Sequence, residues 1–199
     1  TANTTTLKST SMLYSSLMGD GVVEGTVKYE RYVNANFGGN DLISPPLSGG
    51  TWADFLLSGT NATDLLNNGQ SNPTTYAFAP FDKTEDWYVN YTDQELPDLE
   101  LKSGRGYRAA SVDGTTLTFT GTVPTTPITV DIINSGANYP DWNLIGNPYP
   151  SYLNVHDFLN HEVSTGVKNI DLMNGGTAAI YGYDGNGQDG WTIYNLATT

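Results

Sequence analysis

The residues that most resemble a chemical site lie in one glycine-rich loop near the C-terminal end, Asp184 to Gly190. Glycines between oxygen-bearing side chains let a tight loop wrap around a hard cation. The candidate calcium ligands are Asp184, Asn186, Gln188 and Asp189. The EF-hand pattern is not met, since the twelfth position is Asn195 instead of glutamate. An ordinary hairpin loop rich in turn-forming residues is the alternative interpretation. Apart from this candidate Ca²⁺ site, we expect no cofactor.

Acid–base catalysis would require a pair of carboxylates, and one cluster of acidic residues could supply them. Glu95, Asp98 and Glu100 flank Pro97. Two facing carboxylates are what glycosidases use, but acidic residues around a proline in a loop are usually only solvated. No apolar neighbour in the sequence predicts a perturbed carboxyl group here. We therefore predict that the domain is not an enzyme.

Other catalytic and metal-binding patterns are missing or incomplete. The only histidines, His156 and His161, are five residues apart, a spacing that does not place them on one face of a helix as in helical zinc sites. The chain has no cysteine and therefore no thiolate ligand or nucleophile. No Gly-x-Ser-x-Gly motif is present. Gly104-Arg105-Gly106 lacks the third glycine of a dinucleotide-binding loop and is typical of a closely packed strand.

Aromatic residues are the remaining candidates for binding, because sugar rings stack on exposed tryptophan and tyrosine side chains. The predicted ligand-binding residues follow strands at turns: Trp52, Tyr149 and Tyr152. Packing in the core or in turns is the alternative for each. The other three tryptophans occupy repeated positions and are predicted to be core residues: Trp87, Trp142 and Trp191.

An internal repeat predicts the elements that position these residues. Three pairs of segments match at offsets of 102 to 104 residues: 42–48 with 144–151, 53–56 with 156–159, and 81–87 with 183–191. Small insertions fall in loops, as expected for a duplicated unit. Each copy contains one short helical stretch, at 52–57 and 155–159, and Asn154 is a suitable N-cap for the second. The prolines of residues 147–150 predict a constrained turn.

Short strands separated by turn residues predict an all-β fold, a β-sandwich or jelly roll built from two repeated halves. The chain contains 22 glycines and 10 prolines in 199 residues, and the clearest alternating strand runs from Val23 to Val33. We divide the chain into N-terminal strands (1–33), a first half (34–135) and a second half (136–199). A strand equivalent to 104–108 would follow Asn195 by about a dozen residues in the repeat, so the second half is expected to be truncated.

The composition limits the partners. The net charge is −13, which disfavours nucleic acid and anionic membranes because both require basic surfaces. No apolar run approaches the length of a membrane-spanning helix, so membrane insertion is not expected. Only 15% of the residues are charged, well below the usual share of about a quarter. An acidic chain rich in threonine and asparagine fits a secreted setting where divalent cations are plentiful.

Several motifs resemble a module of large surface and secreted proteins of Bacteroidetes, especially marine flavobacteria. The resemblance rests mainly on the block Trp142 to Ser151, with support from Glu30-Arg31-Tyr32, Leu42 to Pro46 and Gly104 to Arg108. It covers nearly the whole chain, about residues 26 to 196. It implies cargo of the type IX secretion system and a location outside the cell or on its outer surface. It implies no reaction and no catalytic residues.

Three functions are compatible with these observations. The first is a non-catalytic extracellular module of a larger protein, used for adhesion or carbohydrate binding. Its partners would be a polysaccharide or surface glycan and other domains of the parent protein. The second is a polysaccharide-degrading enzyme domain, for which no acid–base constellation is evident. A purely structural spacer is the third.

Overall fold

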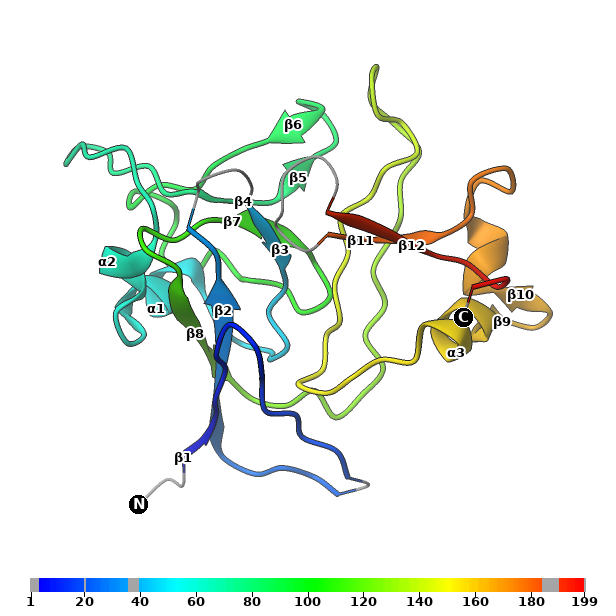
Figure 1. Ribbon diagram of the computed structural model, residues 1–199, viewed down its shortest axis with the longest axis horizontal. Helices are drawn as coiled ribbons and strands as arrows, with labels where there is room; N and C mark the ends of the chain where they lie inside the picture. Colours follow the sequence, from blue (N-terminus) through cyan, green and yellow to red (C-terminus); the bar gives the residue numbers. More distant parts are fainter. Residues whose placement is uncertain (1–3, 20, 36–39, 184–189, 199) are drawn as a thin grey trace.

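The computed structural model describes residues 4–19, 21–35, 40–183 and 190–198 (Figure 1). Strands dominate and helices are short, which confirms the all-β prediction. In the part of the chain described, the strands form five small sheets of two or three strands each. The strands are β1 Thr4–Leu7, β2 Thr26–Val33, β3 Asp41–Ile43, β4 Phe78–Ala79, β5 Phe81–Asp82, β6 Trp87–Tyr88, β7 Tyr107–Ala109, β8 Thr115–Gly121, β9 Glu162–Ser164, β10 Val167–Lys168, β11 Ile180–Tyr183 and β12 Trp191–Tyr194. The helices are α1 Trp52–Leu57, α2 Asn61–Asp64, α3 Val155–Asn160 and the 3-10 helix η1 Asn169–Leu172.

The longest pairing joins the N-terminal strands to the first half. β2 pairs antiparallel with β8 from Val27↔Gly121 to Val33↔Thr115, and β1 pairs parallel with the other edge of β2. Alternate residues of these strands point inwards, because successive side chains of a strand lie on opposite faces. The buried set is Val27, Tyr29, Val33, Leu117 and Phe119. The structure therefore confirms the alternating strand over Thr26–Val33, while residues 23–25 of the predicted strand lie before β2.

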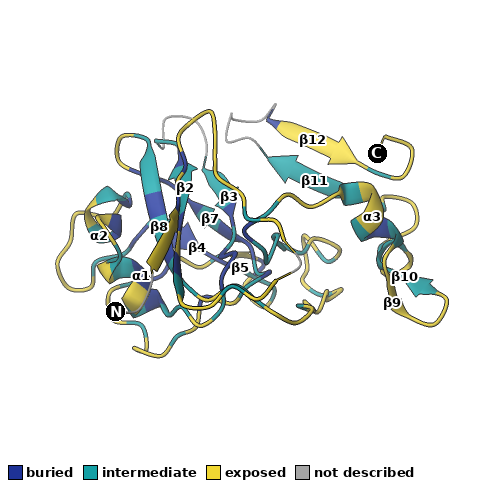
Figure 2. Ribbon diagram, turned by 90° about the horizontal axis from the view of Figure 1, so that it is seen from below, coloured by how far each residue is buried: buried dark blue, intermediate teal, exposed yellow. Residues whose placement is uncertain are grey.

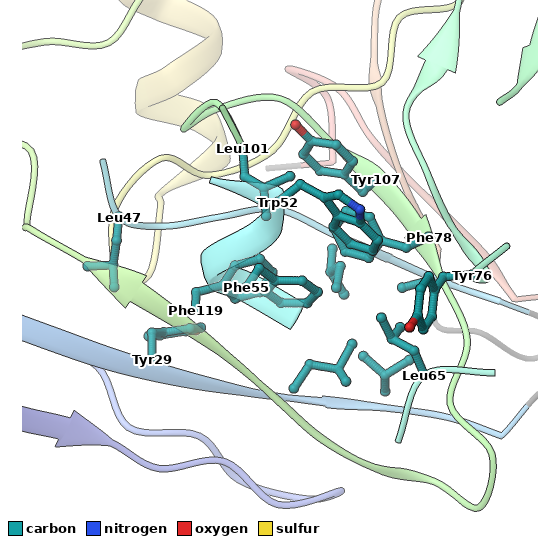
Figure 3. Close-up of a cluster of buried hydrophobic side chains, with 14 of the residues drawn as sticks. Tyr29, Leu47, Trp52, Phe55, Leu65, Tyr76, Phe78, Leu101, Tyr107 and Phe119 are labelled. Atoms are coloured by element: carbon teal, nitrogen blue, oxygen red, sulfur yellow. The ribbon is translucent and has the colours of Figure 1, made fainter. Parts of the chain in front are cut away.

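The core of the first half surrounds Trp52 on α1 (Figure 3). The Trp52 side chain is only 2% exposed. Its ring lies 5.1 Å from that of Phe78 and 5.6 Å from that of Phe55, measured between centroids. The indole N–H would be costly to bury without a partner, and it donates to the main-chain oxygen of Thr92 at 2.6 Å. This ring cluster supplies much of the buried apolar area that stabilises the domain.

The two halves meet along the glycine-rich segment before β7. Gly106 N donates to Leu144 O at 3.1 Å, and Gly146 N donates to Gly104 O at 2.9 Å. A Cβ at Gly106 would lie 2.5 Å from Leu144 Cγ, and one at Gly146 would lie 2.2 Å from the Cβ of Ser44. Both contacts are shorter than van der Waals distance. Glycine is therefore required where the second half meets the first.

The second half contains α3, η1 and two hairpins, β9–β10 and β11–β12. Its strands and helix lie beside the larger first half and carry many exposed residues (Figure 2). Leu159 of α3 is fully buried. Among the helices of the described segments, none is long and apolar enough to cross a lipid bilayer.

Two local structures recur at the offset predicted by the repeat. Thr51 and Asn154 are the N-caps of α1 and α3, and each side chain accepts a hydrogen bond from the main-chain N–H three residues later. Both helices end with an N–H···O bond to the phenylalanine carbonyl, that of Phe55 or Phe158. An antiparallel hairpin then follows in each half, β5–β6 and β11–β12. Duplication of the complete halves stays a prediction.

Candidate binding surface

Four aromatic side chains come together on the β11–β12 hairpin and on the segment before Leu144. The ladder pairs Tyr183 with Trp191, while Tyr181 lies two residues along the same strand face. Trp142 packs against this face, with its ring centroid 4.8 Å from that of Tyr181 and 6.2 Å from that of Trp191. The Tyr183 and Trp191 centroids are 4.8 Å apart. We call Trp142, Tyr181, Tyr183 and Trp191 the aromatic cluster.

The aromatic cluster is open to solvent. Trp142 is 47% exposed and Trp191 is 45% exposed, while the two tyrosines are partly buried. The prediction that Trp87, Trp142 and Trp191 are core residues is therefore wrong, since Trp87 is also 60% exposed. The local sequence could not reveal this, because burial of a ring depends on whether a distant segment covers it.

A loop of the first half holds the segment that carries Trp142. Lys83 Nζ donates to the main-chain oxygens of Tyr139, Pro140 and Trp142 at 2.8, 3.0 and 2.8 Å. The ammonium group is therefore occupied by carbonyl partners. Because these bonds fix the backbone of Trp142 itself, the position of its ring depends on the hairpin loop between β5 and β6.

Asp86, in the same loop between β5 and β6, also binds the segment that carries Trp142. One carboxylate oxygen of Asp86 accepts hydrogen bonds from the main-chain N–H groups of Asn138, at 2.5 Å, and Tyr139, at 3.3 Å. The Asn138 N–H stabilises the charged form and lowers the pKa of Asp86 below its usual value. Asp86 also has a left-handed backbone, with φ of 56°, which aspartate tolerates better than most residues.

The arrangement of the aromatic cluster suits stacking more than catalysis. Its rings are inclined to one another by 41° to 63°, so the cluster presents several ring faces and edges rather than one flat plane. The apolar C–H faces of sugar rings can pack on such surfaces, while the backbone around them stays fixed by hydrogen bonds. Aromatic rings combine large contact area with few rotatable bonds, which limits the entropy lost on binding.

The three residues predicted to bind a ligand have different environments. Trp52 lies in the core, so the expectation that it is exposed is wrong: its ring fills the space between α1 and the strands. Tyr149 is partly buried, and its hydroxyl accepts from Ile128 N at 3.3 Å. The predicted turn is present there, since Tyr149 N donates to Asn147 Oδ1 at 3.0 Å. Tyr149 therefore positions a neighbouring segment.

Tyr152 is 64% exposed, as predicted. Its ring lies 5.1 Å from that of Tyr14, and the Arg31 guanidinium lies 4.8 Å from the Tyr14 centroid. Burial raises the pKa of the Tyr14 hydroxyl above its usual value. Tyr152 and Tyr14, together with the guanidinium of Arg31, form a second, smaller aromatic surface.

The candidate calcium ligands Asp184, Asn186, Gln188 and Asp189 lie outside the described residues. Within the residues that are described, no group of three or more His, Cys, Asp or Glu side chains is placed to hold a metal ion.

The acidic residues considered for catalysis and the two histidines have ordinary structural surroundings. Glu95 Oε1 accepts from both the N–H and the hydroxyl of Thr92 at 3.1 Å, which closes a turn. Asp98 and Glu100 are exposed. His156 and His161 are also exposed, and His156 Nδ1 lies 3.6 Å from the carboxylate of the adjacent Asp157.

Comparison with known proteins gave no family model, no curated protein and no solved structure that matches this chain.

Proposed function

We propose that this chain is a non-catalytic extracellular module of a larger secreted or cell-surface protein and that it binds carbohydrate through the aromatic cluster. The observation that carries the proposal is the exposure of Trp142 and Trp191 beside Tyr181 and Tyr183 on a backbone held by hydrogen bonds. The same proposal includes a role in adhesion or surface display and a location outside the cell or on its outer surface. It also includes association with other domains of the parent protein.

The charge of the chain favours a neutral ligand. The net charge of −13 repels anionic polysaccharides unless a cation such as Ca²⁺ bridges them. Lys83 is the cation beside the Trp142 segment, but its ammonium group already donates to three main-chain carbonyl groups. Neutral polysaccharides are therefore the ligand class expected at this surface. Affinity at one such site is expected to be modest, and repeated modules in a parent protein would increase it through avidity.

Affinity electrophoresis in gels containing neutral polysaccharides tests the proposal. The wild-type chain should be retarded, and Trp191→Ala should abolish the retardation without changing the circular dichroism spectrum. Trp87→Ala is the matched control, because Trp87 occupies the equivalent hairpin position in the first half and is also exposed, at 60%. A second control, Tyr152→Ala, separates the aromatic cluster from the Tyr14–Tyr152 surface.

The outcomes distinguish the alternatives. Equal retardation of wild type and Trp191→Ala places binding elsewhere and contradicts the proposal. Loss of binding only in Tyr152→Ala would move the site to the smaller surface. Absence of retardation on every polysaccharide favours a structural spacer. Release of reducing sugar by the wild type, reduced in Glu95→Gln or Glu100→Gln, would favour a polysaccharide-degrading enzyme. Repeating the gels with calcium and with a chelator tests the Asp184–Asp189 loop.

A further inference from the structure

Three segments of the chain bring tyrosine side chains to one arginine. Tyr29 and Arg31 lie on the same face of β2, because side chains two residues apart on a strand point the same way. Tyr14 comes from the segment between β1 and β2, and Tyr152 comes from the second half. The Arg31 guanidinium lies 4.8 Å from the centroid of the Tyr14 ring, which is 5.1 Å from that of Tyr152. We call Tyr14, Tyr29, Arg31 and Tyr152 the arginine–tyrosine cluster.

Main-chain hydrogen bonds hold the three segments together. β2 is fixed by its ladder with β8. Ser9 pairs with Tyr14 in a β-bridge, which shapes the segment before β2. Leu17 N donates to Pro150 O at 2.7 Å and so ties this segment to the one that carries Tyr152. The cluster is therefore organised before a ligand arrives, which lowers the entropy lost on binding.

The hydroxyl groups of the cluster lie near the guanidinium. Burial raises the pKa of the Tyr29 hydroxyl, and the neighbouring Arg31 guanidinium opposes this rise. The Tyr14 hydroxyl interacts in the same way with Arg31, and the Tyr152 hydroxyl contributes to the raised pKa of Tyr14. Each neutral phenol can donate one hydrogen bond, and a guanidinium has several N–H groups in a fixed fork. The cluster thus gathers hydrogen-bond donors around one positive charge.

The surroundings of Arg31 are poor in negative charge, although the whole chain is acidic. No acidic side chain within the described ranges forms an ion pair with Arg31. Glu30, its neighbour on β2, points to the opposite face of the sheet and accepts a hydrogen bond from Ser9 N at 3.4 Å. The stretches that carry Tyr14 and Tyr152, residues 8–19 and 142–156, contain no acidic residue. The positive charge of Arg31 is therefore not neutralised by a carboxylate of the chain.

We propose that the arginine–tyrosine cluster binds a sugar residue that carries a carboxylate group. The guanidinium fork matches the two oxygens of a carboxylate, and the phenol groups add further donors. Tyr152 is 64% exposed and offers a ring face for the C–H groups of the sugar. A single acidic sugar has one negative charge, so the net charge of −13 opposes it far less than it opposes a polyanion. This site goes beyond the proposed function and does not depend on the aromatic cluster.

NMR titration of the full chain with methyl glucuronide tests the inference. Signals of the Arg31 side chain and of the main-chain amides of Tyr14 and Tyr152 should shift and saturate. Methyl glucoside, which lacks the carboxylate, should bind at least about tenfold more weakly, because it loses the charge-assisted hydrogen bonds. N-acetylglycine, which has a carboxylate but no sugar ring, should also bind at least about tenfold more weakly, since it cannot cover Tyr152.

Two arginine variants provide a matched comparison. Arg31→Gln should weaken the binding of methyl glucuronide about tenfold and remove its advantage over methyl glucoside. Arg108→Gln should leave the affinity unchanged. Arg108 also stacks on a tyrosine, 4.4 Å from the Tyr88 centroid, but it donates to Asn90 Oδ1 at 3.3 Å. Tyr152→Ala alters an exposed side chain that the fold does not need, and it should weaken methyl glucuronide binding as well.

Several results would overturn the inference. They are the absence of saturable shifts at the cluster, shifts confined to the aromatic cluster, and equal losses in Arg31→Gln and Arg108→Gln. Equal affinity for N-acetylglycine would show a carboxylate site without sugar recognition. Tighter binding of methyl glucoside 6-sulfate would replace the carboxylate with a sulfate ester and would also overturn the assignment. Gels with neutral polysaccharides test the aromatic cluster separately, so either site can fail without the other.

Discussion

Helices α1 and α3 begin and end alike, yet their surroundings differ. Thr51 and Asn154 cap them in the same way, and Phe55 and Phe158 occupy the same position in each. Phe55 is 3% exposed because its ring packs against Phe119 of β8, at 4.9 Å, and against Phe78 of β4, at 5.0 Å. Phe158 is only partly buried. The local sequence thus specifies the helix, whereas neighbouring strands decide how much of it is buried.

The same contrast holds for the tryptophans of the two halves. Trp52 is surrounded by aromatic rings and satisfies its indole N–H internally. Trp142 and Trp191 also contact aromatic rings, but each keeps nearly half of its surface in solvent. Large exposed apolar surfaces in soluble proteins usually mark an interaction site. The difference places the closely packed aromatic core in the first half, and the exposed aromatic cluster of the second half is the surface for which we propose binding.

The largest difference between the halves should come from truncating the two equivalent phenylalanines. Phe55→Ala removes a ring from a closely packed core and should lower the free energy of unfolding by about 3–5 kcal/mol. Phe158→Ala removes a partly exposed ring and should cost about 1 kcal/mol. Urea unfolding followed by fluorescence measures both. Equal losses would contradict the assignment of the stable core to the first half.

The helix caps should respond equally, which sharpens the comparison. Thr51→Ala and Asn154→Ala each remove a hydrogen bond to the N–H three residues later, at 3.1 and 3.2 Å. Each should cost about 1 kcal/mol, the usual value for an N-cap. Circular dichroism during urea unfolding reports the loss. A much smaller effect of Asn154→Ala would show that the second half unfolds before the main transition.

The smallest effect concerns pH at the junction of the halves. The pKa of Asp86 is lowered in the folded chain, so its contribution to stability is present above the unfolded pKa of about 4 and is lost as pH falls through the folded value. With Asp86→Asn, the free energy of unfolding should therefore fall less steeply as the pH is lowered from about 5 to about 2. Urea midpoints across this range measure the change. Asp98→Asn, which alters an exposed loop carboxylate, serves as the control.

Local rules were enough to predict much of the fold. Period-two alternation predicted most of β2, and glycines and prolines marked the turns that keep the elements short. The N-cap at Asn154 and the turn after Asn147 were also predictable, because both depend on side chains within a few residues of one another. The glycines of the 104–106 segment indicated close packing, which the contact with Leu144 explains.

The candidate site could not be predicted in this way. Trp52, proposed as exposed, is buried, and Trp142 and Trp191, proposed as buried, are exposed. Exposure of an aromatic ring depends on whether a distant segment covers it, and that segment lies tens of residues away in the sequence.

The sequence by itself determined the strand content, the helix ends, the turns and the acidic charge, because each depends on neighbouring residues or on composition. Only the tertiary structure decided which aromatic residues form the core and which form a surface. Burial is a property of non-local contacts, such as those of Phe119 with Phe55 and of Lys83 with the carbonyl groups before Leu144. Two segments with the same local pattern can therefore have opposite exposure when one is covered by β7 and β8 and the other is not.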